Sequence, residues 1–264
     1  MYLLGYFAAA FIGISLGLIG GGGSILTVPA MVYLFGVSPL LATSYSLFIV
    51  GVTSLAGSIS NIRNRDINYK SVFFLGAASV ATVLITRKFL IPIIPKNLVT
   101  IYGYTITESV FTMVLFGLLM LLASISMISN KKVIAVSNDC QDCFPFSKLL
   151  VYGIGIGLVT GLLGAGGGFL LIPALVFLVK LPMKNAIATS LFVIALNSLF
   201  GFVADLGHFK INWPFLLAVT GIAITGVMIG GLISKKIPSD KLKQGFGWFV
   251  LVMGVCIIIT EIFI

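Results

Sequence analysis

Two glycine-rich segments are the most unusual feature of this sequence, because each one interrupts a long apolar run. The first is Gly20 to Gly23, and the second contains Gly164 and Gly166 to Gly168. A run of glycines ends a helix, and a helix that restarts at Ser24 or at Gly168 would present free N–H groups and the positive end of its dipole. Such a helix end binds anions. The two segments therefore predict a pair of broken helices whose N-termini face a small anion.

Tight helix packing is the alternative explanation, since small residues let membrane helices approach one another closely. It accounts for Gly13 and Gly17, which lie on one helical face. It accounts less well for four successive glycines. A phosphate-binding loop of the Walker A type is excluded, because no Gly-Lys-Ser/Thr follows the glycines and no strand precedes them.

A row of polar residues follows each glycine segment. The first row shares one helical face at spacings of 7, 4 and 4 residues and consists of Ser46, Thr53, Gly57 and Asn61. Its counterpart consists of Ser190, Asn197, Gly201 and Asp205. Hydroxyl and amide donors suit oxyanions, and hydrogen bonds between helices are an equally good explanation. Asp205, which stands where the first row has Asn61, either carries a proton or is a loop residue near His208 and Lys210.

The predicted substrate-binding residues lie in both halves of the chain. They are Gly20, Gly21, Gly22, Gly23, Ser24, Ser46, Thr53 and Asn61, followed by Gly164, Gly166, Gly167, Gly168, Ser190, Asn197 and Asp205. No enzyme activity is expected, because one histidine, seven acidic residues that lie mostly in loops and no nucleophile motif leave no catalytic set. No cofactor is predicted.

Two of the three cysteines, Cys140 and Cys143, form a C-x-x-C pair in the most polar stretch of the chain. A structural zinc site takes four ligands, and the single histidine lies far along the sequence. The pair is therefore either two thiols in a loop without a special role, or a redox pair or half of an intermolecular metal site. Cys256 lies in the last apolar run and is expected in the core.

Composition assigns the chain to the membrane. Hydrophobic residues make up 59% and charged residues 9% of the 264 residues, and the mean hydropathy is +1.19. A soluble domain has about 25% charged residues, so this surface could not be covered in water. Long charge-free runs such as Val110 to Ile128 predict an all-α polytopic membrane protein with about eight to ten membrane helices. The net charge of +9 arises from short basic loops, so no nucleic-acid partner is expected.

The chain contains an internal duplication. A shift of 144 residues aligns residues 13–68 with residues 157–212 without a gap, and 20 of these 56 positions are identical. The shared residues include the glycines, Pro29/Pro173 and Ser46/Ser190. The predicted organisation is a first membrane repeat at residues 1–129, a polar linker at 130–147 and a second repeat at 148–264. Duplicated units with glycine-interrupted hydrophobic segments at matching places are typical of secondary transporters.

The distribution of the 16 Lys and Arg residues predicts the orientation. If the chain crosses once between Leu3 and Phe35, these residues divide 7 to 9 between the two sides. If the chain turns back at Gly20 to Gly23, twelve lie on one side, and the other side holds only Arg87, Lys88, Lys96 and Lys210. The second arrangement places the linker in the cytoplasm and both termini outside. It also gives five crossings per repeat, so the repeats are inverted.

The two glycine segments with their flanking residues resemble the repeat signatures of the TauE/SafE sulfite exporter family, also called the toluene sulfonate uptake permease group. The matching stretches are GLIGGGGSILTVPAMVYLFGVSPLLATSYSLF and GLVTGLLGAGGGFLLIPALVFLVKLPMKNAIATSLF. The G-x-x-G-x-G-G…P core and the Ala-Thr-Ser segment carry the resemblance, and the duplication and length suit the family across nearly the whole chain. The C-x-x-C linker is a departure from it.

The resemblance implies an integral membrane transporter of small organic and inorganic anions, notably sulfite, sulfonates and sulfur-containing acids. With the glycine segments it predicts a secondary transporter that moves a sulfur oxyanion or sulfonate across the cytoplasmic membrane by alternating access. A coupling proton or cation is an expected partner, beside the lipid bilayer. Small carboxylates such as 2-oxo acids, or a scaffold that transports nothing, are the alternatives.

Overall fold

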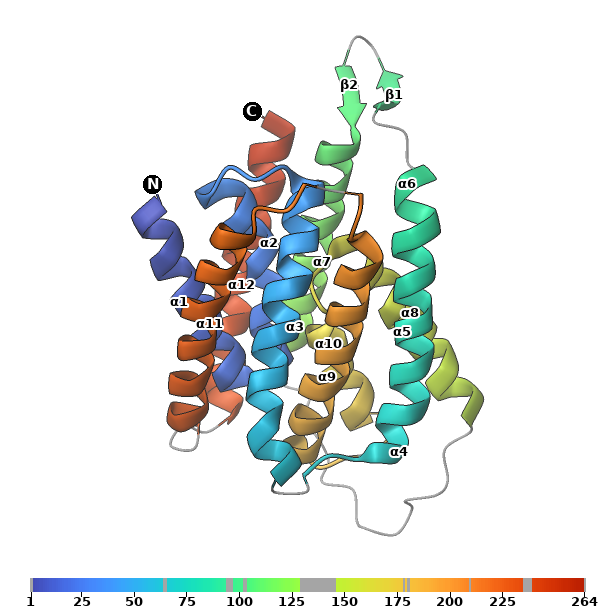
Figure 1. Cartoon of the computed structure of the whole chain (residues 1–264), viewed down its shortest axis with the longest axis vertical. Helices are drawn as coiled ribbons and strands as arrows, with labels where there is room; N and C mark the ends of the chain where they lie inside the picture. The colour runs from blue at the N-terminus through green and yellow to red at the C-terminus, as the bar shows by residue number, and fades with distance from the viewer. Residues whose placement is uncertain are drawn as a thin grey trace.

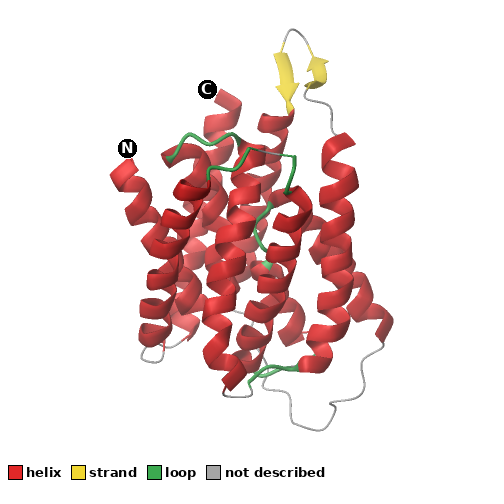
Figure 2. Cartoon of the chain, viewed as in Figure 1, coloured by secondary structure: helices red, strands yellow, loops and turns green. Residues whose placement is uncertain are grey.

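The computed structural model is a bundle of helices with one two-stranded hairpin at one end (Figures 1 and 2). It describes residues 2–63, 66–93, 97–101, 104–128, 146–177, 179, 181–208, 210–234 and 239–263. The start of the first helix and the end of the last helix lie at the same end of the bundle as the hairpin (Figure 1).

The first half begins with α1 (Tyr2–Ile19), the 3-10 helix η1 (Gly21–Leu26), α2 (Thr27–Pro29), the π turn η2 (Ala30–Leu34) and α3 (Pro39–Arg63). One helical segment then consists of α4 (Tyr69–Ser71), η3 (Val72–Gly76), α5 (Ala77–Ile85), η4 (Thr86–Leu90) and α6 (Ile91–Ile93). Within it, η3 and η4 are π turns. Strands β1 (Asn97–Ile101) and β2 (Tyr104–Thr107) and helix α7 (Glu108–Ile128) complete this half.

The second half contains α8 (Phe146–Leu163), α9 (Gly168–Phe177), α10 (Met183–Asp205), α11 (Trp213–Ser234) and α12 (Ser239–Phe263). The described part of the chain is therefore helical except for the hairpin, in which Ile101 pairs with Tyr104 in an antiparallel register. The expectation of an all-helical chain did not include these strands.

The helices have the length and surface of a polytopic membrane protein. Among the described residues, four are long and apolar enough to cross a membrane: Pro39–Ile59, Tyr69–Leu90, Lys184–Asp205 and Trp213–Ile233, and five more apolar helices are shorter. Large apolar side chains point outward, and Phe7, Phe73 and Leu232 are each 67% exposed. Lipid is the environment that accepts such a surface. Cys256 is also exposed, so its predicted place in the core is wrong.

Every principal helix pair joins one helix of the first half to one of the second. Helix α1 packs along α11, α3 along α10, α5 along α8 and α7 along α12. The glycines at small-residue spacing lie in these contacts, since Gly13 meets the backbone of Ala223 and Gly17 meets that of Val227. Close helix packing is therefore the role of Gly13 and Gly17, as the sequence indicated.

Contacts between the halves occur in matching pairs that follow the 144-residue shift. Gly13 packs on Ala223, and the corresponding residue Gly157 packs on Ser79. The N–H of Asn68 donates to Thr189 Oγ1 over 3.1 Å, and the N–H of Asn212 donates to Tyr45 Oη over 2.8 Å. Each contact is thus repeated with the two halves exchanged.

Corresponding helices also run in opposite directions. Helix α1 begins at the end of the bundle that carries the termini, whereas α8 begins at the opposite end (Figure 1). The division of the chain at residues 130–147 remains a prediction, because residues 130–145 lie outside the described part.

Candidate functional site

The chain reverses its direction at the first glycine segment. Gly20 has φ +78°, a conformation that glycine adopts without a steric penalty. After it, Phe35 returns to the start of α1, where its ring contacts that of Tyr6 at a centroid distance of 5.8 Å. The stretch from Leu3 to Phe35 is therefore a hairpin of two helical segments and not one long span. Helix resumes at Gly21, three residues earlier than the predicted restart at Ser24, so Gly22, Gly23 and Ser24 lie inside η1.

The second glycine segment makes a corresponding turn. Gly164, Gly166 and Gly167 have φ of +67°, +68° and +67°. Gly167 then lies against Thr160 of the preceding helix, and α9 begins at Gly168 as predicted. Three residues in the left-handed region explain why this segment requires glycine.

The two glycine segments meet inside the bundle. A Cβ atom on Gly21 would lie 2.5 Å from Gly168 Cα and 2.5 Å from Ile194 Cδ1, so neither glycine can carry a side chain without a shift of backbone. Ile194 is in the middle of α10, which places the contact near the middle of the bundle. The first turn of α9, in which the N–H groups of Leu170 and Leu171 donate to Gly167 O, therefore begins where the halves touch.

Several buried polar side chains have no hydrogen-bond partner among the described residues, and the hydroxyls of Ser198 and Thr160 are the ones that lie beside the second glycine segment. The Oγ of Ser198 would be 3.1 Å from a Cβ atom on Gly166. Further unpartnered oxygens are those of Ser46 and Ser54 in α3 and Oδ1 of Asn197 in α10. Because a buried donor or acceptor without a partner is costly, such groups are candidates for contact with a ligand.

The remaining predicted polar ligands are engaged within the protein. Ser24 donates to Gly21 O over 2.7 Å, Thr53 to Ile49 O over 2.6 Å and Ser190 to Ile187 O over 2.9 Å. Asn61 is only half-buried and donates to Gly57 O over 3.4 Å. The packing explanation therefore describes these four side chains. Asn197 is intermediate, because its Nδ2 donates to Ser79 Oγ over 2.6 Å while its Oδ1 has no partner.

A buried ion pair is the feature that the sequence did not predict. Arg87 Nη1 lies 2.8 Å from Asp205 Oδ2, and the two side chains are 0% and 3% exposed. The sequence had placed Arg87 among the loop residues, but it lies inside the apolar span Tyr69–Leu90, in the π turn η4. Asp205 is the last residue of α10 and not a loop residue. In the sequence, the signal for this ion pair is one charged residue near the end of each of two otherwise apolar helices.

Polar groups of α3 join the ion pair to the second glycine segment. Ser44 Oγ donates to Asp205 Oδ2, and Arg87 Nη1 donates to Thr43 Oγ1 over 3.1 Å. A Cβ atom on Gly164 would lie 2.6 Å from Thr43 Cβ. Arg87, Thr43 and the Gly164 turn are thus consecutive neighbours. Nε and Nη2 of Arg87 are buried and have no partner among the described residues.

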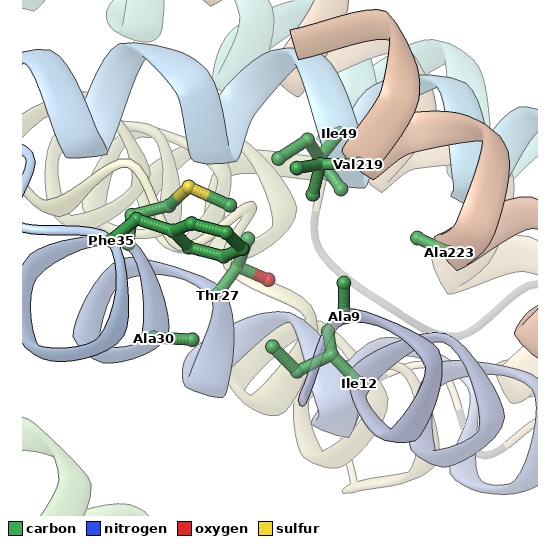
Figure 3. A pocket seen from close by; sticks show the side chains of 9 residues that line it. Ala9, Ile12, Thr27, Ala30, Phe35, Ile49, Val219 and Ala223 are labelled. Atoms are coloured by element: carbon green, nitrogen blue, oxygen red, sulfur yellow. The ribbon is translucent and has the colours of Figure 1, made fainter. Parts of the chain in front are cut away.

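Two pockets are lined mostly by apolar side chains, and neither is lined by Arg87, Asp205 or a glycine of the two segments. The first, of about 210 Å³, lies between α1, α2, η2, α3 and α11 and holds no space for a water molecule. Ala9, Ile12 and Ala223 line it, and the unpartnered Thr27 hydroxyl supplies its polar atom (Figure 3). The second has Leu40, Ile91 and Leu163 in its wall. No described pocket opens onto the glycine contact, which is closed in this conformation.

Cys140 and Cys143 lie outside the described residues, so their redox or metal role remains a prediction. Among the described residues, no group of three or more His, Cys, Asp and Glu side chains could hold a metal ion.

Comparison with known proteins identifies a family. The profile described as "Sulfite exporter TauE/SafE" matches residues 5–257. The chain is 28% identical to "Probable membrane transporter protein YunE" of Bacillus subtilis, over 93% of each chain. It is 28% identical to a membrane transporter protein of Xylella fastidiosa (strain Temecula1), over 95% of this chain and 92% of the relative. It is 25% identical to MJ0441 of Methanocaldococcus jannaschii, over 92% and 90%. No solved structure matches the chain.

Proposed function

The chain belongs to the TauE/SafE sulfite exporter family of membrane transporters, and we propose that it moves a small sulfur oxyanion or sulfonate of the sulfite, thiosulfate or sulfoacetate type across the cytoplasmic membrane. The contact between the two glycine segments is the observation that carries this proposal. It brings the start of α9 and the hydroxyl of Ser198 together at mid-bundle. The N-terminus of a helix and a buried hydroxyl without a partner, here that of Ser198, are groups that an oxyanion binds.

The mechanism we propose is alternating access. The matching contacts that join the two halves, and the opposite directions of corresponding helices, support an inverted repeat around the glycine contact. In such carriers the substrate stays near the membrane midplane while the surrounding helices rock, so that the site opens to one side and then to the other. In this mechanism the contact between Gly21 and Gly168 has to open to admit the anion.

Thermal unfolding of the purified protein in detergent tests the substrate class. The anions are sulfite, thiosulfate, sulfoacetate, sulfate, pyruvate and chloride, and sulfite also requires a cysteine-free variant because it attacks disulfides. A bound anion at about 100 times its dissociation constant adds roughly 2.7 kcal/mol to the free energy of unfolding. We expect a selective shift for one sulfur oxyanion. A shift with pyruvate alone would indicate a carboxylate carrier, and no shift with any anion would favour the scaffold.

A further inference from the structure

The ion pair of Arg87 and Asp205 lies where charges are costly. Both residues are inside apolar spans, Tyr69–Leu90 and Lys184–Asp205, and both side chains are almost fully buried. A buried pair adds little stability compared with apolar residues of the same shape, because desolvation offsets the attraction. Ionisable residues within a membrane are therefore candidates for a function, and this pair also joins the two halves of the protein.

The guanidinium group of Arg87 is only partly used. Asp205 and Thr43 both accept from Nη1, while Nε and Nη2 have no partner among the described residues. Arginine presents its N–H groups as a planar fork that fits two oxygens of one oxyanion. The unused nitrogens thus form an incomplete oxyanion site, beside the Gly164 turn that Thr43 contacts.

We propose that Arg87 binds the transported oxyanion through Nε and Nη2, and that Asp205 is the counter-ion on Nη1 that takes up one proton when the anion binds. This inference rests on the proposed function, and it assigns both the residue that neutralises the substrate and the coupling ion. In the empty carrier the Asp205 carboxylate alone neutralises Arg87.

Charge balance provides the reason for the proton. Arg87 and Asp205 together are neutral, and a monovalent anion added to them would leave one negative charge uncompensated in the membrane interior. Burying an unpaired charge costs several kcal/mol, so the group changes its protonation instead. One proton on Asp205 restores neutrality. Arg87 and Ser44 both donate to Oδ2, so Oδ1 is the atom that receives the proton.

The contacts of Asp205 come from two other elements and from its own. From η4, Arg87 faces it, and from α3, the uncharged Ser44 and Thr43 lie at the pair. On its own side of the bundle, the N–H of the exposed His208 donates to Asp205 O over 3.1 Å. Lys88, the next residue after Arg87, is exposed to its surroundings. Asp205 is thus one turn from the exposed His208.

Titration calorimetry of the purified protein tests the proposal, with methanesulfonate and ethanesulfonate as probes because both are monovalent and their charge does not change in the range used. Experiments in buffers of different ionisation enthalpy give the protons taken up per anion. We expect about one proton for wild type, and an affinity that falls as the pH rises. Asp205→Asn is expected to bind the anion without proton uptake and without this pH dependence.

Three variants complete the test. Arg87→Gln/Asp205→Asn removes both charges together, so it should fold and bind neither probe. Asp66→Asn is the matched control, because it breaks the exposed pair of Asp66 with Lys184 over 2.9 Å and should bind as wild type does. Arg87→Lys keeps the positive charge but lacks the planar set of N–H groups, and we expect it to bind the anion at least tenfold more weakly.

Two results would each overturn this inference and leave the proposed transport function intact. One is anion binding by wild type without proton uptake, and the other is wild-type affinity in the folded double variant. If wild type binds neither probe nor any anion of the thermal panel, the proposed function fails and this inference fails with it.

Discussion

Buried hydroxyl groups divide into two kinds, and the difference separates packing residues from candidate ligands. Thr53 and Ser190 donate to carbonyls of their own helices, as serine and threonine commonly do in membrane helices. Ser46 and Ser198 have no partner among the described residues, although each belongs to a helix of the same kind. Only the second pair has donors available for an anion.

Replacing Ser198 with alanine is therefore expected to weaken anion binding. A hydrogen bond to a charged group contributes about 1.5–3 kcal/mol, which corresponds to at least a tenfold loss of affinity. Ser124→Ala is the matched control, since Ser124 is equally buried but donates to Leu121 O within α7. Anion-dependent thermal shifts give both affinities, and equal affinities for the two variants would contradict the assignment of Ser198.

Glycine at the contact is required for a steric reason. Gly168→Ala places a Cβ atom against the backbone of Gly21, so we expect a loss of stability of about 1–3 kcal/mol and a loss of transport. Gly155→Ala is the control, because no atom lies within 4 Å of a Cβ atom there. Melting temperature and anion uptake are measured for both variants. Wild-type uptake by Gly168→Ala would show that the glycine contact can be opened without consequence.

The sequence predicted the glycines but not the charges. Four successive glycines in an apolar run have few explanations, and the φ of +78° at Gly20 agrees with them. The pairing of Arg87 with Asp205 joins residues 118 positions apart and depends on how the halves pack. Adjacent Lys88 made Arg87 look like part of a basic loop. No local pattern distinguishes a hydroxyl that bonds its own helix from one that does not.

At the scale of elements, the helix pairs between the halves depend on small residues. Gly13 of α1 lies directly against the backbone of α11. Gly13→Leu should separate α1 from α11 and lower the free energy of unfolding by about 1–3 kcal/mol. Gly221→Leu on the exposed side of α11 should have little effect, because its Cβ atom has open space. Thermal unfolding in detergent compares the two, and similar melting temperatures would contradict the packing role of Gly13.

Hydropathy predicted the helices but not their irregular turns. The segment Tyr69–Leu90 has the hydropathy of one membrane helix, and the structure has a continuous helical segment there with π turns at η3 and η4. A π turn depends on the backbone's neighbours as much as on its own residues, so periodicity does not reveal it. The β1–β2 hairpin, at the end of the bundle, lies outside the apolar pattern altogether.

At the scale of the whole molecule, the two halves form one interleaved bundle. Each of α1, α3, α5 and α7 has its principal partner in the other half. In the proposed mechanism, a movement of one half relative to the other would take place along these shared surfaces. The small residues in these surfaces, and the matching Asn68 and Asn212 contacts, are places where such sliding would occur.

Orientation in the membrane gives a prediction for the cysteines. The excess of basic residues predicts a linker in the cytoplasm, and in that orientation an impermeant maleimide should label Cys140 and Cys143 in inside-out vesicles and not in intact cells, with Cys256 replaced by serine. Ser38→Cys in a background without native cysteines should show the reverse, because the loop before α3 lies at the end that carries the termini. Labelling of the linker in intact cells would reverse the orientation.

Counterflow in proteoliposomes tests the central claim most directly. Vesicles that contain the purified protein are loaded with unlabelled thiosulfate and diluted into labelled thiosulfate, alongside vesicles with Gly168→Ala and vesicles without protein. We predict transient accumulation of the label in wild-type vesicles alone, because a carrier exchanges substrate through one site that opens to each side in turn. If wild-type vesicles accumulate no more thiosulfate, sulfite or sulfoacetate than empty vesicles, the glycine contact is not the site of a sulfur oxyanion carrier.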